Sequence, residues 1–366
     1  MSEKMKNRVI VVVSIVLVYG FLLWGIFQKD GSLSVSERRK LTQFPKLSVE
    51  TVLSGEFMEK FDKYTLDQFP LRDLFRRVKA YTSFYVLRQK DNHDIYLQDG
   101  HAIKMEYPLN EKSIEHAADR FSYVYDKLLA GKVNNVYVSL IPDKNYFAAA
   151  DAGYLSLNYD DFVGKLTDRM LYAEYLDLFP VLSLEDYYAT DTHWRQEKLR
   201  QTAVFLAQEM GVTLSDSYTV KKAEVPFYGV YYGQSALPLP AEDIFYLEAD
   251  WMQDCIVTDY ETDRQMPFYT LEKLQGNDPY ELFLGGPKSL ISIENPNATT
   301  DKELIVFRDS FGSSLMPLLA EGYRKITLAD IRYIQPDILA GFLQCEGADA
   351  LFLYSTSVIN HSETIK

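Results

Sequence analysis

Residues 303–354 read ELIVFRDSFGSSLMPLLAEGYRKITLADIRYIQPDILAGFLQCEGADALFLY in one-letter code, and this stretch decides the fold. Its apolar runs and turn residues predict three strands and two helices. The strands are expected at residues 304–307, 325–329 and 351–354, and the helices at residues 312–322 and 335–343. A β-α-β-α-β order makes neighbouring strands parallel, because each helix returns the chain to the same edge of the sheet. We therefore expect an α/β fold built on a doubly wound parallel sheet.

A serine lies at the tip of the first turn in this stretch. Residues 306–312 run from the predicted strand into a tight turn, with Ser310 between strand and helix. A serine hydroxyl is a weak nucleophile until a base takes its proton, and the helix that follows offers backbone N–H groups to an oxyanion. Ser313 and Ser314 are weaker candidates, because they would lie inside the helix and face solvent less openly. Ser310 is therefore the candidate nucleophile.

A base and an acid for such a serine occur together in Asp191-Thr192-His193-Trp194. In an Asp-x-His turn the two side chains can approach each other, so Asp191 could accept the Nδ1 hydrogen of His193. Trp194 would then pack beneath the imidazole and hold it. The alternative is structural, because Asp191 or Thr192 could cap the amphipathic helix expected at residues 196–210. These residues alone leave both interpretations open.

A further candidate side chain lies where ligands usually collect. Lys144 follows an apolar strand predicted at residues 136–141, at the carboxyl end of that strand. In open α/β sheets ligands bind outside this end of the strands. Lys144 is thus a candidate for holding a substrate carboxylate or hydroxyl, and a merely solvated lysine is the alternative.

The sequence contains little that suggests a metal or a cofactor. Asp191 and His193 would need further metal ligands, and the scattered spacing of the other histidines supplies none. The two cysteines, Cys255 and Cys345, lack the CxxC spacing of a zinc site, so they are either free thiols or a disulfide pair. We therefore expect no metal and no cofactor.

The composition is that of a globular, acidic protein. Of the 366 residues, 47% are hydrophobic and 25% are charged, which is enough apolar material for a large core. The formal net charge of −14 argues against a nucleic-acid partner, because binding to phosphates needs a basic face.

The amino terminus predicts a membrane anchor. Residues 9–27 form an apolar run that would span about 28 Å as a helix, close to the thickness of the bilayer core. Lys4, Lys6 and Arg8 precede this run and place the N-terminus in the cytoplasm. A cleaved signal peptide is the alternative, but the run is long for one and no Ala-x-Ala site follows. We expect a single-pass protein of the cell membrane, with a cytoplasmic tail at residues 1–8, a transmembrane signal anchor at residues 9–27 and the remainder outside the cytoplasm.

Two parts follow the anchor. Residues 28–90 are expected to form a juxtamembrane linker and a helical neck, in which Pro70 separates two helices. The second of these helices carries Leu74, Phe75 and Val78 on one face. Residues 91–366 would form the α/β domain, with an irregular, tyrosine-rich insertion near residues 212–284.

Several motifs together carry a family resemblance. Besides Asp191-Thr192-His193-Trp194 and the Asp309-Ser310-Phe311 turn, the chain contains Ser36-Glu37-Arg38-Arg39, Asp67-Gln68-Phe69-Pro70-Leu71-Arg72-Asp73, Ile141-Pro142-Asp143-Lys144, Phe283-Leu284-Gly285-Gly286 and Asp330-Ile331-Arg332-Tyr333. In this order they resemble the DHHW family of bacterial surface proteins. More widely they are similar to the AlgX/AlgJ family of SGNH-hydrolase-like polysaccharide O-acetyltransferases.

The resemblance implies an SGNH-hydrolase-like α/β domain with a Ser-His-Asp catalytic triad. Matched by motif, Ser310 is the nucleophile, His193 the base and Asp191 the orienting acid. Two positions depart from the family pattern. Thr192 stands where the DHHW name has histidine, and Arg308 stands where relatives often carry glycine or lysine, which leaves the substrate open.

The remaining site candidates are residues that would bind the oxyanion or the substrate. They are Gly285, Gly286, Lys144, Arg308 and Trp194. The two glycines would offer backbone amides to the oxyanion, although a Gly-Gly pair more commonly forms only a turn.

The function implied is that of a membrane-anchored, extracytoplasmic serine acyl-transfer enzyme that O-acetylates a cell-surface polysaccharide. Its expected partners are the polysaccharide acceptor and, by family analogy, a polytopic membrane protein that donates the acyl group. A surface carbohydrate esterase that removes acetyl groups is one alternative. A non-catalytic glycan-binding protein on the same fold is the other.

Overall fold

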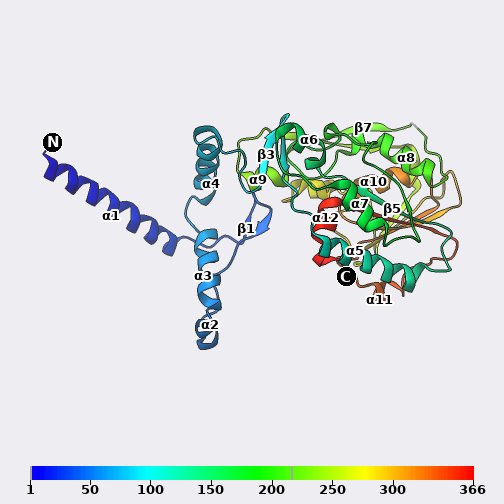
Figure 1. The fold of residues 1–366 in the computed structure, drawn as a ribbon, viewed down its shortest axis with the longest axis horizontal. Coiled ribbons are helices and arrows are strands. Elements are labelled where there is room, and N and C mark those ends of the chain that lie inside the picture. The colour runs from blue at the N-terminus through cyan, green and yellow to red at the C-terminus, as the bar shows by residue number, and fades with distance from the viewer. Residues whose placement is uncertain (1, 216) are drawn as a thin grey trace. The chain divides into compact units, whose positions relative to one another are not determined.

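Two units make up the part of the chain that the computed structural model describes, residues 2–215 and 217–366 (Figure 1). The first unit contains Met1–His93 and Tyr232–Pro238. The second contains Asp94–Tyr231 and Leu239–Lys366.

The first unit is mostly helical. Its elements are α1 (Glu3–Phe27), β1 (Leu33–Ser34), β2 (Arg39–Lys40), α2 (Val49–Leu53), α3 (Glu56–Asp67), α4 (Arg72–Tyr81) and the π-helical turn η1 (Thr82–Val86). Helix α1 is long and apolar enough to cross a membrane, and none of its described residues is buried. Ser2 caps its first turn by accepting from the Met5 amide.

Charged side chains hold the neck together. The buried carboxylate of Asp67 accepts from Arg39 Nη1 at 2.9 Å, from Arg39 Nη2 at 2.6 Å and from the amide of Thr42 at 2.8 Å. The hydrogen bonds from Arg39 hold the pKa of Asp67 well below its usual range. Glu37 pairs with Arg72 and, at 3.3 Å, with Arg76. The polar side of α4 is thus tied to the turn between β1 and β2.

An eight-stranded sheet forms the centre of the second unit. The strand order is β10-β9-β11-β13-β12-β14-β5-β6. The bounds are β5 (Val136–Ile141), β6 (Glu174–Tyr175), β9 (Ile256–Asp259), β10 (Arg264–Met266), β11 (Leu290–Glu294), β12 (Glu303–Arg308), β13 (Lys325–Ala329) and β14 (Asp349–Ser355). Strands β13, β12, β14, β5 and β6 run parallel to one another.

The other edge of this sheet departs from the expected parallel arrangement. Strand β11 is antiparallel to both β13 and β9, and β9 is antiparallel to β10. A short turn joins β9 to β10, and a turn of that length can only join antiparallel neighbours. The fold is therefore mixed α/β with a large, parallel-rich sheet, and the expectation of a wholly parallel sheet was wrong for this edge.

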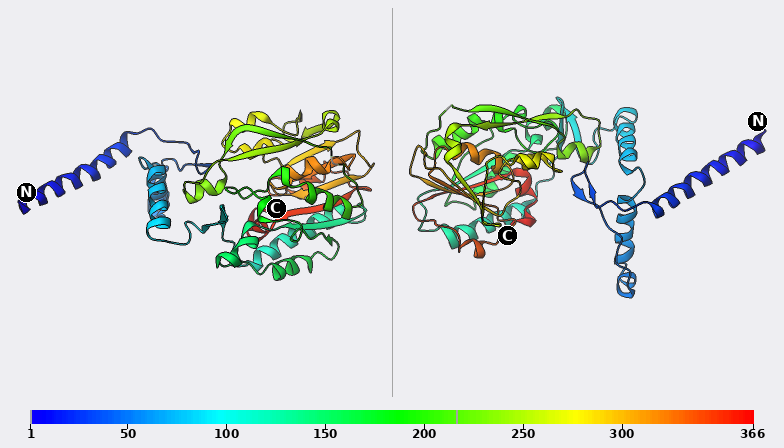
Figure 2. Two further views of the ribbon diagram at one scale, coloured as in Figure 1. Left: turned by 90° about the horizontal axis from the view of Figure 1, so that it is seen from above. Right: turned by 180° about the vertical axis from the view of Figure 1, so that it is seen from behind.

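Helices cover both faces of the sheet (Figure 2). On β12, Leu304 and Val306 point into one apolar cluster, whereas Ile305 and Phe307 point into the other. The first cluster includes side chains from α8 (Arg200–Glu209) and α10 (Gly312–Leu319). The second includes side chains from α5 (Glu111–Val124), α7 (Tyr159–Thr167), α11 (Pro336–Leu339) and α12 (Thr356–Asn360). Burial on both faces explains why β12 is a continuous apolar run and not an alternating one.

Most elements predicted for residues 303–354 are present. Strand β13 has the expected bounds, and β12 and β14 extend slightly beyond theirs. The second helix is shorter than expected, because α11 ends at Leu339. Beyond it the amides of Gly341 and Phe342 donate to the carbonyls of Ile338 and Leu339, three residues back. Such bonds tighten and end a helix.

The remaining elements surround this sheet. Strands β3 (Ile95–Gln98) and β4 (His101–Lys104) form the hairpin around Asp99 and Gly100, and η2 (Tyr125–Leu129) extends α5. Residues 212–284 contribute the antiparallel pair β7 (Thr219–Phe227) and β8 (Glu242–Glu248), as well as β9, β10 and α9 (Val230–Ser235). Further helical segments are α6 (Lys144–Ala152), η3 (Leu184–Asp186), η4 (Gln196–Lys198), η5 (Asp250–Asp254), η6 (Leu271–Gln275), η7 (Pro279–Leu282) and η8 (Ser362–Thr364). Cys255 and Cys345 are both free thiols.

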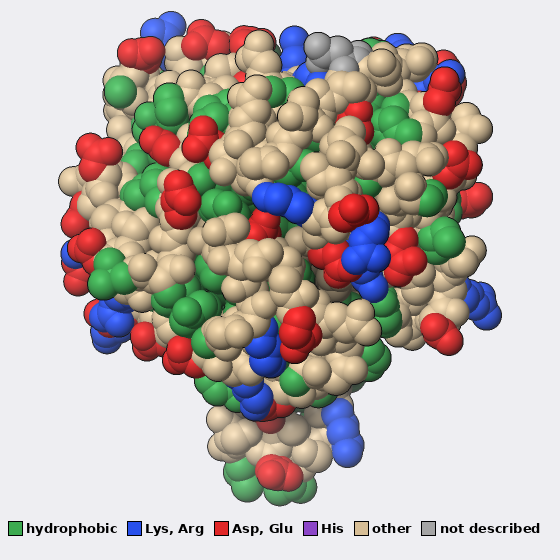
Figure 3. Space-filling model, turned by 90° about the vertical axis from the view of Figure 1, so that its right-hand side faces the viewer, with side chains coloured by type: hydrophobic (Ala, Val, Ile, Leu, Met, Phe, Trp, Pro, Cys, Tyr) green, Lys and Arg blue, Asp and Glu red, His purple; other side chains and the backbone are tan. Residues whose placement is uncertain are grey.

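Acidic and basic side chains are interspersed over the face seen in Figure 3, and neither sign gathers into one large patch there. On that face no broad basic patch is present, and the whole chain carries a net charge of −14.

Candidate active site

Ser310 lies in the turn between β12 and α10, at the carboxyl end of the strand. The buried carboxylate of Asp309 holds this turn, since its Oδ1 accepts from the Phe311 amide at 3.0 Å and its Oδ2 from the Ser355 amide at 2.8 Å. A Cβ on Gly312 would lie 3.0 Å from Cβ of Arg308, so the sharp turn favours glycine there. Ser310 itself is partly exposed, whereas Asp309 is fully buried.

Asp191 and His193 lie in a loop that a single antiparallel bridge closes, between Tyr187 and Trp194. Within the loop the Tyr188 amide donates to the His193 carbonyl at 3.0 Å, and the His193 amide donates to Asp191 Oδ1 at 3.1 Å. This second bond is the Asx turn that an Asp-x-His sequence favours. The alternative of a capped helix is wrong, because η4 and α8 begin later and have Arg195 and Leu199 at their N-cap positions.

The structure brings Asp191, His193 and Ser310 into one hydrogen-bonded chain. The Nδ1 atom of His193 lies 2.6 Å from Asp191 Oδ1, and the Nε2 atom lies 2.8 Å from Ser310 Oγ. Because an ionised carboxylate can only accept, Nδ1 carries the hydrogen, and Nε2 of the neutral ring accepts from the serine hydroxyl. The second oxygen of Asp191 accepts from the Val230 amide at 2.7 Å. The Asp191 side chain is 1% exposed and the His193 side chain 12%, so solvent reaches the imidazole but not the carboxylate.

Tyr280, from η7, flanks the imidazole. Its ring stacks on the His193 ring with centroids 4.0 Å apart and planes 12° apart, and its hydroxyl lies 2.8 Å from Ser314 Oγ. Burial raises the pKa of Tyr280 well above its usual value, so the hydroxyl is neutral. The ring centroid of Phe311 lies 4.9 Å from that of the same imidazole.

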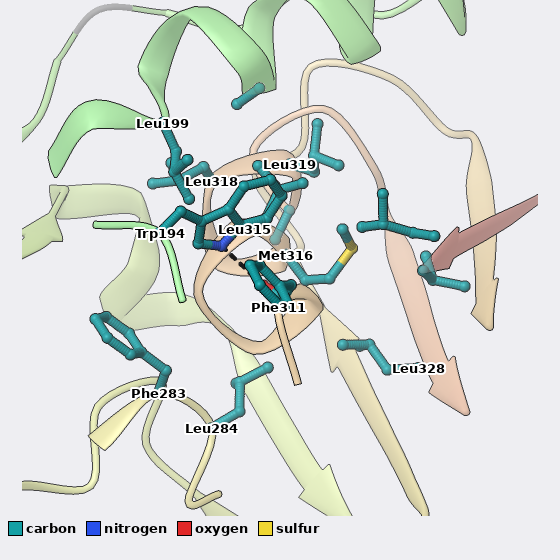
Figure 4. Packing of buried hydrophobic residues seen from close by; sticks show 14 of the residues in the cluster. Trp194, Leu199, Phe283, Leu284, Phe311, Leu315, Met316, Leu318, Leu319 and Leu328 are labelled. Atoms are coloured by element: carbon teal, nitrogen blue, oxygen red, sulfur yellow. Dashed lines mark hydrogen bonds between the residues drawn. The ribbon is translucent and has the colours of Figure 1, made fainter. Parts of the chain in front are cut away.

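Trp194 does not hold the imidazole as expected. It is fully buried, and its Nε1 donates to the Phe311 carbonyl at 3.1 Å and to Ser314 Oγ at 2.8 Å. Figure 4 shows the indole packed against Phe311 and the apolar side chains of α10, with the bond to Phe311 drawn as a dashed line. Trp194 therefore anchors the start of α10 from a buried position.

Lys144 and Glu242 both bind the backbone of this loop, Lys144 as a hydrogen-bond donor and Glu242 as an acceptor. Lys144 Nζ donates to the carbonyls of Tyr188 at 2.8 Å and Ala189 at 3.1 Å. Glu242 accepts from the amides of Ala189 and Thr190, each at 2.7 Å, and from the Thr190 hydroxyl at 2.6 Å. Lys144 is 3% exposed, and this burial lowers its pKa to about 7. The lysine predicted to bind substrate is instead committed to backbone carbonyls.

Gly229 lies directly against the same loop. A Cβ at this position would be 2.2 Å from both the carbonyl carbon and the carbonyl oxygen of Thr190. The Gly229 amide donates to Thr190 Oγ1 at 2.9 Å. The next amide in the chain, that of Val230, donates to Asp191 Oδ2. Only glycine allows the two backbones to approach closely enough for both bonds.

The other sequence candidates lie in different surroundings. Arg308 is 1% exposed; its Nη1 donates to the Asp309 carbonyl at 3.3 Å, and burial lowers the pKa of its guanidinium. Gly285 and Gly286 are buried and have left-handed backbone, with φ of 70° and 89°. The Gly286 amide donates to the Phe283 carbonyl at 3.2 Å, so it is engaged in a turn and not free for an oxyanion.

Sequence reasoning missed three residues that shape this site, namely Asp309 as a brace, Glu242 and Tyr280. Asp309 could have been found from its position, because an aspartate after a buried strand and before a turn favours an Asx bond. Glu242 and Tyr280 had no such signal, since each meets the loop only through the tertiary fold.

Solved structures of two proteins share this fold. A DHHW family protein from Eubacterium siraeum matches with a TM-score of 0.56 at 19% identity, over 74% of this chain and 93% of that one. PatB1 from Bacillus cereus matches with a TM-score of 0.55 at 16% identity, over 74% of this chain and 98% of that one. A second PatB1 structure, which carries a sulfonyl adduct, matches with a TM-score of 0.54 at 16% identity, over 72% of this chain and 95% of that one.

At the level of sequence, no protein-family model matches the chain, and no curated protein matches it. Identities below 20% to the solved structures establish a common fold and nothing about the reaction. The chain therefore has the fold of a DHHW family protein and of PatB1, in agreement with the resemblance in its motifs.

Proposed function

We propose that the chain is a membrane-anchored, extracytoplasmic serine acyl-transfer enzyme that O-acetylates a cell-surface polysaccharide. The observation that carries this proposal is the hydrogen-bonded chain from Asp191 through His193 to Ser310. Its geometry is that of an activated serine, in which a base removes the hydroxyl proton and a buried acid orients the base. The SGNH-hydrolase-like motifs supply the choice of an acetyl group and a sugar acceptor.

The reaction runs through an acetylated serine. His193 Nε2 takes the proton of Ser310 while Oγ attacks the acetyl carbonyl, and the donor's leaving group departs with that proton. A sugar hydroxyl then gives its proton to His193 and attacks the acetyl carbon. The bond from that carbon to Ser310 Oγ breaks, and His193 returns the proton to Oγ, so the O-acetyl sugar leaves and Ser310 is restored. Asp191 keeps the Nδ1 hydrogen in place and stabilises the imidazolium that forms in each half-reaction.

Negative charge that develops on the carbonyl oxygen needs a donor close to Ser310. The proposed donor is the Ser310 backbone amide, because the amides of Phe311 and Gly286 already donate to Asp309 and to Phe283. The positive end of α10 begins directly after this turn and adds to the stabilisation of an oxyanion.

The donor of the acetyl group must reach an active site outside the cytoplasm. A polytopic membrane protein that carries acyl groups across the membrane is the proposed partner. The anchor α1 would keep the enzyme in the same membrane as that partner.

Labelling of the nucleophile tests the proposal. The full chain in detergent should react with a fluorescent sulfonyl fluoride and should release acetate from an aryl acetate, whereas Ser310→Ala should lose both activities. Ser313→Ala is the matched control, because Ser313 is a buried serine in the next turn, and this variant should react like the wild type. Labelling of Ser310→Ala at the wild-type rate would overturn the assignment.

Product analysis then separates the three functions. With an aryl acetate donor and a soluble polysaccharide acceptor, a transferase forms O-acetyl sugar, whereas an esterase releases only acetate and also deacetylates an acetylated glycan. A glycan-binding protein without turnover would be neither labelled nor active, and that result would end the enzymatic proposal.

A further inference from the structure

The neck helix α4 exposes an apolar face. Leu71, Leu74, Phe75, Val78 and Tyr81 follow the helical spacing i, i+3, i+4, i+7 and i+10, and their side chains are between 44% and 54% exposed. Residues at this spacing line one side of a helix. In an ordinary helix of a soluble protein such a stripe faces the core.

The opposite side of α4 is polar and is the side that packs. Arg76 Nη2 donates to the carbonyl of Gly233 at 2.8 Å, and Arg72 pairs with Glu37. Ala80 on this side is fully buried. The charged side of the helix therefore faces inward, whereas its apolar side stays 44% to 54% exposed, although Phe21 of α1 contacts Phe75.

The apolar face begins next to the helix that would span the membrane. The Phe21 ring of α1 stacks on Phe69 with centroids 5.6 Å apart, and it meets Phe75 edge-on at 5.7 Å. Gln68 Nε2 donates to the Gly31 carbonyl at 2.9 Å and so fixes this corner to the chain that leaves α1. Phe21 precedes the last residue of α1, Phe27, by about 9 Å of helix rise. The start of α4 thus lies beside the final turns of α1 and not beyond them.

Basic side chains surround the apolar face. Residues 71–90 contain six lysines and arginines and one aspartate, although the whole chain carries a net charge of −14. Two of the six, Arg72 and Arg76, pair with Glu37 on the inward side. Arg77 and Lys79 are exposed on the two flanks of the apolar stripe. An apolar stripe edged by cations suits the surface of a membrane with anionic lipids. It suits a second copy of the same helix poorly, because like charges would meet.

We propose that α4 and η1 lie in the outer interface of the bilayer that α1 spans, with Leu74, Phe75 and Val78 among the acyl chains. Arg77 and Lys79 contact anionic headgroups on either side. The inference rests on the proposed membrane anchoring by α1 and is independent of the chemistry of Ser310. It makes the neck a second membrane contact that limits the tilt of the anchor.

Fluorescence quenching by lipids tests this placement. The full chain would be reconstituted in vesicles of phosphatidylcholine and phosphatidylglycerol, with an environment-sensitive dye on Val78→Cys. The matched position is Asp73→Cys on the same helix, where the native side chain is 52% exposed beside the polar face. Ile15→Cys in α1 reports on the anchor itself. The native thiols can stay in place, because Cys345 is 3% exposed and burial raises the pKa of Cys255 to about 12.

The expected result is emission from Val78→Cys that is shifted to the blue and quenched several-fold more by nitroxide-labelled lipids than emission from Asp73→Cys. Equal, weak quenching at both positions with strong quenching at Ile15→Cys would overturn the interfacial helix and leave the anchor intact. A blue shift without lipid quenching at Val78→Cys would assign the face to a protein partner instead. Weak quenching at Ile15→Cys would overturn the anchoring and the inference together.

Discussion

One buried and one partly buried charged side chain, Lys144 and Glu242, hold the loop that carries Asp191 and His193. The Lys144 side chain donates to two backbone carbonyls of this loop, and the Glu242 carboxylate accepts from two of its amides. A buried carbonyl or amide left without a partner costs about 1–3 kcal/mol. The loop conformation, and with it the distance from His193 to Ser310, therefore depends on the hydrogen bonds of Lys144 and Glu242 to the loop backbone.

Replacement of Lys144 should reveal this dependence. Lys144→Met keeps the bulk of the side chain but leaves the Tyr188 carbonyl without its donor, whereas the Ala189 carbonyl keeps the Ala102 amide at 2.8 Å. Sulfonyl labelling of Ser310 should therefore slow roughly tenfold. Lys165→Met, at a partly exposed lysine on α7, should label at the wild-type rate. Equal rates for the two variants would show that the loop does not need Lys144.

The pKa of Lys144 also predicts a pH dependence of stability. Burial lowers this pKa to about 7 in the folded protein, whereas the unfolded chain holds the proton up to about pH 10.4. Between these two values the unfolded state binds more protons, so Lys144 makes folding more favourable as the pH rises through that window. Thermal unfolding of the detergent-solubilised chain should be measured at pH 7 and pH 10. The unfolding temperature should rise less between these two pH values for Lys144→Met than for the wild type. A gain of the same size in both would contradict the assignment.

At the scale of elements, the parallel strands bring the pieces of the site to one edge of the sheet. Asp309 and Ser310 follow the end of strand β12. The neighbouring strand β14 ends at Ser355, whose amide donates to Asp309. The carboxyl ends of parallel neighbours lie side by side, which is why polar groups collect there. The His193 loop then needs only to reach this edge, and its close packing against Gly229 sets how far it extends.

Two glycine substitutions should therefore have opposite effects. Gly229→Ala would place a methyl group against the Thr190 carbonyl and should lower the free energy of unfolding by about 1–3 kcal/mol, with slower Ser310 labelling. Gly164→Ala, in α7, meets nothing within 4 Å and should raise the same quantity by about 0.5–1 kcal/mol without a change in labelling. Urea unfolding of both variants measures the difference. A stable, fully reactive Gly229→Ala would show that the loop can move away.

At the scale of the whole molecule, the apolar helix α1 lies N-terminal to every residue of the candidate active site. Helix α1 could cross a membrane by length and composition, and the three basic residues before its apolar run favour a cytoplasmic N-terminus. The candidate active site would then lie outside the cytoplasm, on the side of the membrane where surface polysaccharides are found.

Labelling of intact cells tests this orientation. A membrane-impermeant maleimide should modify Lys366→Cys in intact cells and Ser2→Cys only after the membrane is opened, with the unmodified chain as the blank. The reverse pattern would invert the topology. Release of Lys366→Cys into the medium would instead indicate that the anchor is cleaved.

The sequence by itself determined the local features. The apolar runs at residues 304–307 and 325–329 form strands, the Asp-x-His turn folds as an Asx turn, and the run at residues 9–27 is helical. Each follows from periodicity or from bonds between residues at most a few positions apart, so a short window of sequence contains the cause. The candidates Asp191, His193 and Ser310 came from the same local patterns and from the resemblance of their motifs.

The tertiary structure alone decided how these pieces meet. The bond from His193 to Ser310 joins residues 117 positions apart, and the stacking of Tyr280 on His193 depends on how η7 packs. The antiparallel edge of the sheet and the exposure of the apolar face of α4 are equally non-local. No short window contains the cause of such contacts, because the packing of the whole sheet and its helices sets which distant side chains are brought within a few ångströms.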